Sequence, residues 1–408
     1  MTADGDERIP PGFGRDAAGR LLIAGRPAED WVRDAGDTPL FVYDRHLIDA
    51  RIAALRAALP AGLGLHYAVK ANPMPALLAH MAPLVDGFDI ASAGELERLL
   101  EAGVQPVRIS FAGPGKRDAE LAAAIEAGVT LNVESAGELA RAGRIAADRG
   151  KRARVALRVN PPFQLKGSGM RMGGAASPFG VDADTAPALI AAMQQPPFDW
   201  RGLHVYAGSQ NLSVDALLEA AGQTVALAAR LVDGVGAPVV NLGGGFGVPY
   251  FPGDRPLDLA RLGAGLGQIL AARPAVLRDS AFVLELGRYL VAEAGVYLCR
   301  VVDRKVSGGE TFLVTDGGLH HQLAATGNFG TVVRRNYPLT NASRAMPPVE
   351  TATVAGCLCT PLDRLADRAT LPETREGDLI ALFMAGAYGR TASPEAFLGH
   401  PPASEILA

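Results

Sequence analysis

Short β-type runs alternate with Ala- and Leu-rich helical stretches from about residue 45 to residue 290. There are eight strand-like runs, at residues 65–70, 86–92, 108–113, 130–135, 154–160, 202–208, 237–243 and 281–287. Regular strand–helix alternation indicates parallel pairing, because a crossover helix returns the chain to the end of the sheet where the previous strand began. Eight such units predict an α/β fold of the (β/α)8 TIM-barrel type.

A short sequence repeat supports a fold built from repeated units. The sequence SAGEL occurs at 92–96 and again at 135–139, each time directly after a predicted strand. In both copies a serine precedes a helical stretch and a glutamate follows three residues later, which is the capping-box pattern. Each copy is therefore expected to begin a helix of the barrel.

The two ends of the chain have a different pattern. From residue 291 the sequence turns to β-branched and aromatic runs separated by Gly and Pro, and residues 1–44 hold short extended pieces such as LLIAG. This pattern is typical of strands. We therefore predict a barrel domain over 45–290 and a second, β-rich domain made of 1–44 plus 291–408.

Composition excludes several function classes. The 408 residues carry a net charge of −4, which gives no electrostatic footprint for nucleic acid or an anionic membrane. No run approaches the ~18 apolar residues of a membrane span, and the acidic start MTADGDERIPPG does not resemble a signal peptide. Three cysteines are too few for a disulfide framework, which favours a reducing, cytoplasmic location.

Lys70 is the first candidate for chemistry. It ends the run HYAVK, and in a barrel the reactive groups lie at the carboxyl ends of strands. A lysine with a desolvated stem has a lowered pKa, and its free amine can form a Schiff base. A surface lysine with a solvated head group is the alternative interpretation.

Two later strand ends carry an anion-binding pattern. Gly243–Gly245 follow the seventh strand, where backbone N–H groups can approach a phosphate; an ordinary glycine turn is the alternative. Glu285 ends the eighth strand and Gly287 and Arg288 follow it. The carboxylate could pair with a protonated ring nitrogen while Arg288 serves the phosphate, or the two could form a structural ion pair.

Other polar residues fall at neighbouring strand ends. His204 and Tyr206 lie on one face of the sixth strand, Ser209 offers a hydroxyl to a phosphate, and Arg158 ends the fifth strand.

The cysteine pair in the β-rich part is Cys357 and Cys359. It has no further Cys or His at a ligand spacing, so it is a poor zinc site, and two buried strand cysteines are the alternative. The adjacent His320 and His321 have no H-x-x-x-H or acidic partner pattern either. We therefore expect no metal.

Taken together, the motifs resemble the fold-type III pyridoxal-phosphate decarboxylases, the group of the diaminopimelate, ornithine and arginine enzymes. The resemblance runs from FVYD at 41–44 to FLGHP at 397–401. Between them stand YAVKAN, GFDIASAGEL, ISFAGPGK, HVYAGSQ, NLGGGFG, ELGRYLV, TDGG, CTPLD and AGAYG, in this order.

The resemblance implies a role for each residue. Lys70 holds pyridoxal 5'-phosphate as a Schiff base, Glu285 pairs with its ring nitrogen, and Cys359 protonates the carbanion after carbon dioxide leaves. The residues that it places around the cofactor are Lys70, Asp89, Glu95, Arg158, His204, Tyr206, Ser209, Gly243, Gly244, Gly245, Glu285, Gly287, Arg288 and Tyr388. The cysteine comes from a second subunit in the family, which implies a homodimer with shared active sites.

Departures from the family pattern concern the substrate, to which the resemblance assigns Thr360 and Asp363. The acidic residue that usually follows the cysteine and receives a distal ammonium group is Thr360 here, and the Arg-Pro of diaminopimelate enzymes is Ala324-Ala325. The histidine that stacks on the ring aligns with Tyr206, with His204 nearby. The usual Tyr-Asn after AGAYG reads Phe-Leu at 397–398.

A smaller subgroup shares these departures, together with MGG at 172–174 and FLGHP. It includes a decarboxylase of a glutamyl group tethered to an acyl-carrier protein in butirosin-type antibiotic assembly, and exosortase-associated decarboxylases. A substrate tethered to a carrier needs no charged side chain to bind its distal end. The resemblance therefore implies that the substrate is a carrier-bound, glutamyl-like aminoacyl group. The alternatives are a decarboxylase of a free amino acid such as diaminopimelate, a racemase, and a non-catalytic barrel that binds a partner protein.

Overall fold

The computed structural model describes residues 9–408 except 168, 172, 252, 328–334, 346 and 348. Met172 of the MGG motif therefore lies outside the described residues. The chain forms two compact units, one of Ile52–Val248 and Arg255–Tyr289, the other of Met1–Arg51, Pro249–Asp254 and Leu290–Ala408. The prediction kept 45–290 as one uninterrupted segment, whereas Pro249–Asp254 belongs to the unit that holds both chain ends.

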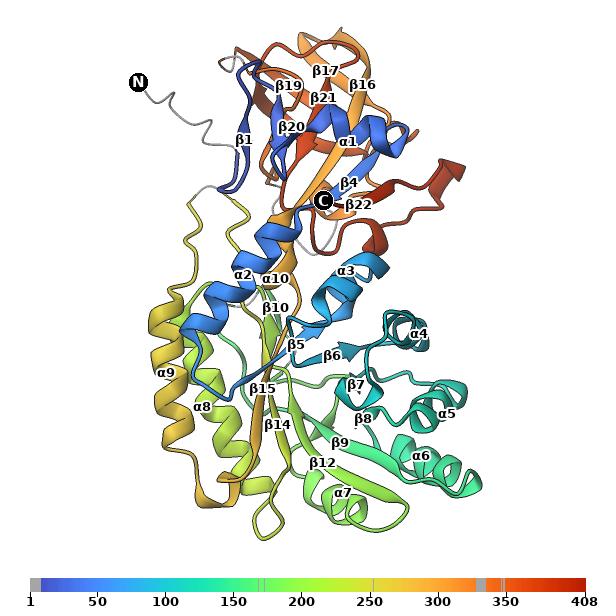
Figure 1. The fold of residues 1–408 in the computed structure, drawn as a ribbon, viewed down its shortest axis with the longest axis vertical. Coiled ribbons are helices and arrows are strands. Elements are labelled where there is room, and N and C mark those ends of the chain that lie inside the picture. The colour runs from blue at the N-terminus through green and yellow to red at the C-terminus, as the bar shows by residue number, and fades with distance from the viewer. Residues whose placement is uncertain are drawn as a thin grey trace. The chain divides into compact units, whose positions relative to one another are not determined.

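The first unit is a closed barrel of parallel strands (Figure 1). Its strands are β5 (Gly64–Ala68), β6 (Gly87–Ile90), β7 (Ile109–Phe111), β8 (Thr130–Val133), β9 (Ala153–Asn160), β12 (Phe198–Val205), β14 (Val239–Gly244) and β15 (Ala281–Leu286). They pair in this order, and β15 pairs with β5 to close the ring. Each of the eight predicted runs overlaps one of these strands, so the predicted barrel is confirmed.

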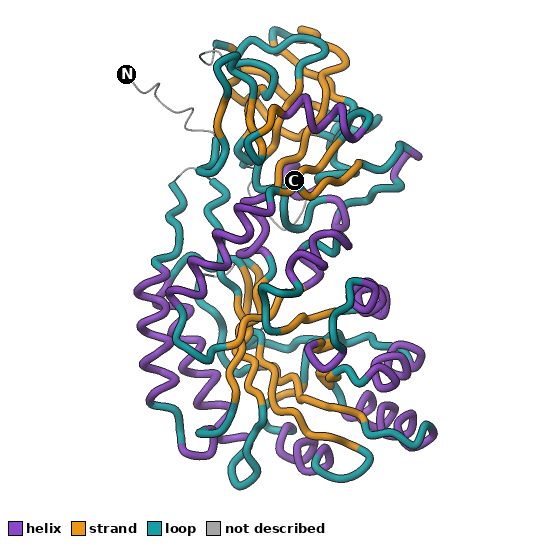
Figure 2. Tube along the Cα trace, viewed as in Figure 1, coloured by secondary structure: helices purple, strands orange, loops and turns teal. Residues whose placement is uncertain are grey.

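Helices follow the strands and lie outside the barrel, as the tube in Figure 2 shows. They are α2 (Arg45–Ala58), which leads into β5, then α3 (Pro75–Met81), α4 (Ala93–Glu101), α5 (Asp118–Ala127), α6 (Ala136–Asp148), α7 (Ala186–Met193), α8 (Val214–Leu231), α9 (Leu259–Ala271) and the short α10 (Arg288–Val291). Strands covered in this way are buried along most of their length, which explains why they read as continuous apolar runs.

The SAGEL repeats begin α4 and α6, as predicted. Ser92 and Ser135 accept hydrogen bonds from the backbone N–H of Glu95 and Glu138. The return contact differs from a capping box, because each glutamate accepts from the residue before the serine, Ala91 N–H in one copy and Glu134 N–H in the other. The glutamates therefore brace the ends of β6 and β8.

The second unit is β-rich, as predicted. Its larger sheet has the order β18 (Leu339–Asn341), β21 (Leu379–Leu382), β16 (Gly295–Ser307), β17 (Glu310–Thr315), β19 (Glu350–Ala355) and β20 (Arg364–Leu371). From the two chain ends, β4 (Leu40–Tyr43) pairs with β16 and with β22 (Ser404–Leu407). A small sheet of β1 (Gly14–Arg15), β2 (Leu21–Ile23) and β3 (Arg26–Pro27) precedes α1 (Ala28–Ala35).

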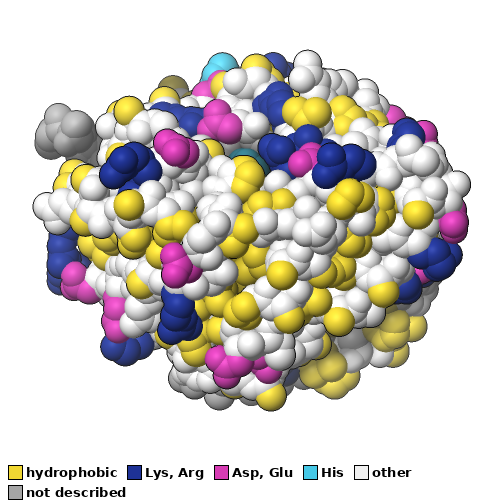
Figure 3. Space-filling view, turned by 90° about the horizontal axis from the view of Figure 1, so that it is seen from below, with side chains coloured by type: hydrophobic (Ala, Val, Ile, Leu, Met, Phe, Trp, Pro, Cys, Tyr) yellow, Lys and Arg dark blue, Asp and Glu magenta, His cyan; other side chains and the backbone are white. Residues whose placement is uncertain are grey.

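Short elements complete the chain: β10 (Met170–Arg171), β11 (Val181–Asp182), β13 (Gly208–Ser209) and 3-10 turns, among them η1 (Val69–Ala71), η5 (Leu323–Thr326) and η7 (Phe397–Gly399). Among the described helices, none has the length and apolarity needed to cross a membrane. The face shown in Figure 3 carries Lys and Arg side chains interspersed with Asp and Glu, with apolar side chains between them, so its charges are of mixed sign.

Candidate active site

A cavity of about 380 Å³ opens at the carboxyl ends of the barrel strands. Small-molecule sites in proteins span roughly 300–1,000 Å³, so this one can hold a cofactor-sized ligand. Six predicted site residues line it: Lys70, Asp89, Arg158, His204, Tyr206 and Glu285. They come from five different strands or the turns that follow them, which only the closed barrel brings together.

Lys70 stands just beyond its strand. The prediction ended the first strand at Lys70, but β5 stops at Ala68 and η1 follows. The turn leaves the side chain half-exposed, with its Nζ 3.7 Å from Oε1 of Glu285 and 5.2 Å from the centroid of the Tyr206 ring. The amine thus reaches the cavity between an acid and an aromatic face.

Glu285 is the buried anion of the cavity. Its Oε2 lies 2.8 Å from Nε2 of His204, which is also buried. Burial raises the pKa of Glu285, but the hydrogen bond from His204 and the charges of Lys70 and Arg158 outweigh it and hold that pKa well below its ordinary value. The carboxylate is therefore charged at neutral pH and can pair with a protonated ring nitrogen.

Two buried polar atoms in this cavity have no hydrogen-bond partner among the residues that the structure describes. One is Oδ1 of Asp89, whose other oxygen lies 3.1 Å from Nδ1 of His66. The other is Nδ1 of His204. Because buried polar groups are normally paired, these atoms indicate a polar ligand.

A second charge network borders the cavity and was not predicted. Glu134 lies 2.9 Å from Nη1 of Arg158 and accepts backbone N–H groups of Gly113 and Gly180. Lys116, from the ISFAGPGK motif, is buried and lies 2.7 Å from Glu138. The signal available in the sequence was the position of Glu134 near the end of the predicted run 130–135, since reactive groups of a barrel lie at the carboxyl ends of its strands.

Glu95 lies at the edge of this site. Burial raises its pKa, the charge of Lys70 opposes that rise, and its Oε2 accepts the N–H of Ala91. Its visible role is therefore to brace the end of β6 beside the lysine.

The glycines at the end of β14 are required by close packing. A Cβ on Gly243, Gly244 or Gly245 would lie within 2.6 Å of a backbone oxygen, of Val205, Glu285 and Gly208 respectively. Gly243 and Gly245 also have positive φ. The N–H of Gly243 donates to Asn241, so one of the three predicted phosphate donors is already used.

The other predicted phosphate residues of the barrel lie near this turn or near Lys70. Ser209 follows Gly208, against which Gly245 packs. A Cβ on Gly287 would lie 2.9 Å from the Cβ of Ala71, next to Lys70. Arg288 begins α10 directly after Gly287.

The remaining predicted residues belong to the second unit. Cys357 and Cys359 lie in the loop after β19 rather than in a strand, and Cys359 is exposed. Thr360 follows in the same loop. Asp363, predicted to contact substrate, is buried, and its two oxygens accept the N–H groups of Leu319 and Leu358.

Tyr388 follows β21 with a φ of +54°, a value that non-glycine residues seldom adopt.

Comparison with known proteins decides the family. Residues 45–292 match the family described as "Pyridoxal-dependent decarboxylase, pyridoxal binding domain". This chain belongs to that family. It is therefore a pyridoxal-phosphate-dependent carboxy-lyase, as the motifs predicted.

Individual relatives cover nearly the whole decarboxylase. An L-glutamyl acyl-carrier-protein decarboxylase of Niallia circulans is 37% identical over 384 residues, 91% of this chain and 89% of the relative. A diaminopimelate decarboxylase of Aquifex aeolicus is 33% identical over 95% of this chain and 90% of the relative.

Solved structures agree. The diaminopimelate decarboxylase of Helicobacter pylori complexed with L-lysine superposes with a TM-score of 0.82 at 27% identity, over 93% of this chain and 94% of that one.

The barrel fits the cofactor of this decarboxylase family. The cavity offers an amine from Lys70, a charged carboxylate from Glu285 and two buried polar atoms that lack partners within the described part of the chain. These groups match an aldehyde, a protonated ring nitrogen and polar ring substituents. Pyridoxal phosphate can therefore be held by the residues present.

Proposed function

We propose that Lys70, Glu285 and His204 form the reactive centre of this decarboxylase. The observation that carries the proposal is their convergence in one cavity: Nζ of Lys70 lies 3.7 Å from Glu285, and Glu285 lies 2.8 Å from His204. Lys70 would attach covalently to the aldehyde, and Glu285 would hold the proton on the ring nitrogen. His204 would keep Glu285 charged and oriented.

When bound, pyridoxal phosphate withdraws electrons from the bond to the departing carboxylate group. The residues of the chain set the conditions for that step. Glu285 keeps positive charge on the ring nitrogen because its own pKa is held low. Tyr206, whose ring faces Lys70 at 5.2 Å, would lie beside the ring and exclude water from one of its faces.

Within the barrel unit, the phosphate end would be held by backbone N–H groups of Gly244 and Gly245 and by Ser209 and Arg288. The support is local: the Gly243–Gly245 turn packs against the backbone of Val205 and of Glu285, and Glu285 lines the cavity. Backbone amides in such a turn bind anions without a cationic side chain.

Cys359 would supply the proton that replaces the carboxylate, from a second subunit of a homodimer. The thiol is exposed, and so are three large apolar side chains of the same unit, Leu362, Phe397 and Leu398. The contact of Cys357 with His400 brings the loops that carry them together. Exposed apolar groups gathered around a reactive thiol favour a partner surface.

The substrate would be an aminoacyl group tethered to a carrier protein. Thr360 follows Cys359 where a carboxylate would receive a distal ammonium group, and Ala324 and Ala325 are buried and uncharged in η5. A thioester-linked substrate has no free distal carboxylate to bind. The relative named for an L-glutamyl acyl-carrier protein supports this choice.

A free diamino acid is the second candidate, supported by the relatives named as diaminopimelate decarboxylases. A cytoplasmic location accompanies either candidate, since all three cysteines are reduced.

Carbon dioxide release by the cofactor-loaded protein tests these substrates. The panel holds free lysine, ornithine, diaminopimelate and glutamate, and the same acyl groups charged on a carrier protein. Release only from the charged carrier is the expected result. Release from a free diamino acid would agree with decarboxylase activity but contradict the proposal of a tethered substrate.

A further inference from the structure

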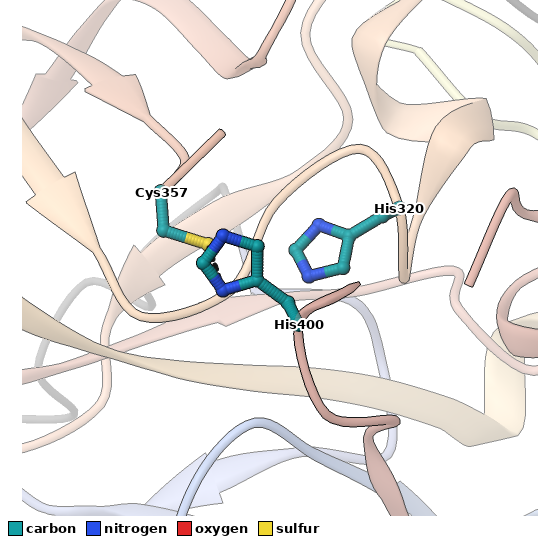
Figure 4. Close-up of side chains that lie close together, drawn as sticks. All are labelled: His320, Cys357 and His400. Carbon is teal, nitrogen blue, oxygen red and sulfur yellow. Dashed lines mark hydrogen bonds between the residues drawn. The ribbon is translucent and has the colours of Figure 1, made fainter. Parts of the chain in front are cut away.

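Three possible metal ligands lie close together in the second unit. Ligand atoms of His320, Cys357 and His400 all lie within 4.8 Å of one another (Figure 4). The Sγ of Cys357 is 3.8 Å from Nδ1 of His400, and the ring centroids of His320 and His400 are 5.3 Å apart. The three side chains come from three loops, after β17, after β19 and after η7.

His320 provides an independent observation. It is fully buried, and neither of its ring nitrogens has a hydrogen-bond partner in the part of the chain that the structure describes. A buried imidazole without partners is costly, because both nitrogens have lost water. Burial lowers its pKa to about 4, so the ring is neutral and a lone pair is available at neutral pH.

The neighbouring His321 shows the contrast. It is buried too, but its Nδ1 lies 3.1 Å from the hydroxyl of Tyr297 and its Nε2 lies 3.0 Å from the carbonyl oxygen of Pro401. Both of its nitrogens are used within the protein. His321 therefore needs no ligand, and the unmet requirement is specific to His320.

We propose that His320, Cys357 and His400 bind a zinc ion or a similar divalent transition metal. One thiolate and two imidazoles are donors that zinc prefers. With Zn–S near 2.3 Å and Zn–N near 2.0–2.1 Å, a tetrahedral ion holds its sulfur and nitrogen donors about 3.6 Å apart. The present 3.8 Å between Cys357 and His400 needs little adjustment, and water takes the fourth position.

The ion would join the three loops that carry its ligands. Asp363 already ties the loop of Leu319 to the loop of Leu358 through two backbone hydrogen bonds. The metal adds a second tie to the segment of His400, which the contact of His321 with Pro401 already joins to the first of these loops. Because Cys359 stands two residues after Cys357, the ion fixes the loop that carries the exposed thiol.

Only the thiolate of a cysteine is a metal ligand, so the thiol of Cys357 gives its proton to the buffer as the metal–sulfur bond forms.

The test uses the full-length, cofactor-loaded protein after treatment with a chelator. Zn²⁺ is added, excess ion is removed by dialysis, and bound metal is counted by mass spectrometry. Co²⁺ is added to a second sample, and its difference spectrum is recorded against the same protein without metal. We expect about one ion per chain and the thiolate-to-cobalt absorption of a tetrahedral site.

Ligand variants and matched controls complete the experiment. Cys357→Ser and His400→Ala should weaken binding more than about 100-fold, since loss of an outer-shell partner alone costs 10–100-fold. Cys359→Ser and His46→Ala remove an exposed thiol and an exposed imidazole, and should leave binding unchanged. Cofactor absorbance and elution volume verify that each variant is folded.

Several outcomes would overturn the proposal. They are wild-type protein without bound ion, a cobalt spectrum without the thiolate band, or equal binding by Cys357→Ser and wild type. Because these measurements record the ion and not carbon dioxide, their failure would leave the proposed decarboxylase mechanism untouched. If the ligand variants do not fold, the metal content and the cobalt spectrum of the wild-type protein still decide.

Discussion

Replacing Glu285 by Gln tests how strongly the barrel holds this carboxylate in its charged form. Gln approximates the shape of the protonated acid and removes its charge. Burial alone would raise the pKa of Glu285, but His204, Lys70 and Arg158 lower it from 4.5 to about 2. At about 1.36 kcal/mol per pH unit, this difference corresponds to about 3 kcal/mol of stability, which Glu285→Gln should lose.

The assay must report the barrel alone, since a chain of two compact units need not unfold in one step. The protein has two tryptophans, Trp31 in the second unit and Trp200 on β12. In a Trp31→Phe background, the fluorescence of Trp200 follows urea unfolding of the barrel. The cofactor is removed first, so that lost ligand binding does not add to the loss of free energy of unfolding.

The exposed pair of Glu219 with Lys166, 2.9 Å apart, supplies the matched control. Glu219→Gln should change the free energy of unfolding by less than about 1 kcal/mol, as exposed pairs do. A loss below about 1 kcal/mol for Glu285→Gln as well would refute the reasoning, because the buried carboxylate would then gain nothing from its neighbours.

The pH dependence carries a definite sign. The folded pKa of Glu285 lies below the unfolded value, so its contribution is complete above about pH 4.5 and disappears as pH falls toward 2. The difference between wild type and Glu285→Gln should therefore be constant from pH 8 to about 5.5. If the difference in free energy of unfolding instead falls between pH 8 and 6, it must come from the titration of another group.

Three further changes separate the parts of the site. Lys70→Ala should abolish the visible cofactor band and reduce turnover by several orders of magnitude; persistence of the band would reject Lys70. Cys359→Ser should keep the band and slow turnover by about 10²–10⁴-fold, measured as carbon dioxide release, and an unchanged rate and product would make Cys359 a packing residue. Gly245 has a φ of +81°, and a Cβ there would lie 2.3 Å from the carbonyl oxygen of Gly208. Gly245→Ala should therefore lower the free energy of unfolding of the barrel by at least about 1–3 kcal/mol, measured by urea unfolding, and weaken cofactor retention, measured by dialysis. Wild-type values in both assays would mean that the turn accommodates the methyl group.

The barrel could be predicted because its strands are buried on both faces and stand out as apolar runs. Their ends were harder to place. β12 begins at Phe198, four residues before the predicted run. Its first residues include the charged Asp199 and Arg201, and the strand pairing shifts register between Trp200 and Gly202. Period-two patterning does not survive such a shift, so the sequence alone could not show where this strand starts.

The charge pairs of the site depend on long-range closure. His204 and Glu285 are 81 residues apart on strands that are not adjacent in the barrel, and Arg158 meets Glu134 from the neighbouring strand. Residue types at strand ends predicted which groups gather at the barrel mouth, but not which pairs form. Partner choice depends on strand register and tilt, which only the closed barrel defines.

The same limit explains why no metal site was expected. A ligand pattern can be read from the sequence when two donors share one turn or hairpin, whereas His320, Cys357 and His400 lie on three loops that β-sheet pairing brings together. The two units are therefore expected to have different roles. In the proposed mechanism, barrel residues hold charge on the cofactor, so their variants should change its spectrum, while the loop of Cys357 and Cys359 presents a thiol. Variants of that loop should then change proton delivery or metal content and leave the spectrum as it is.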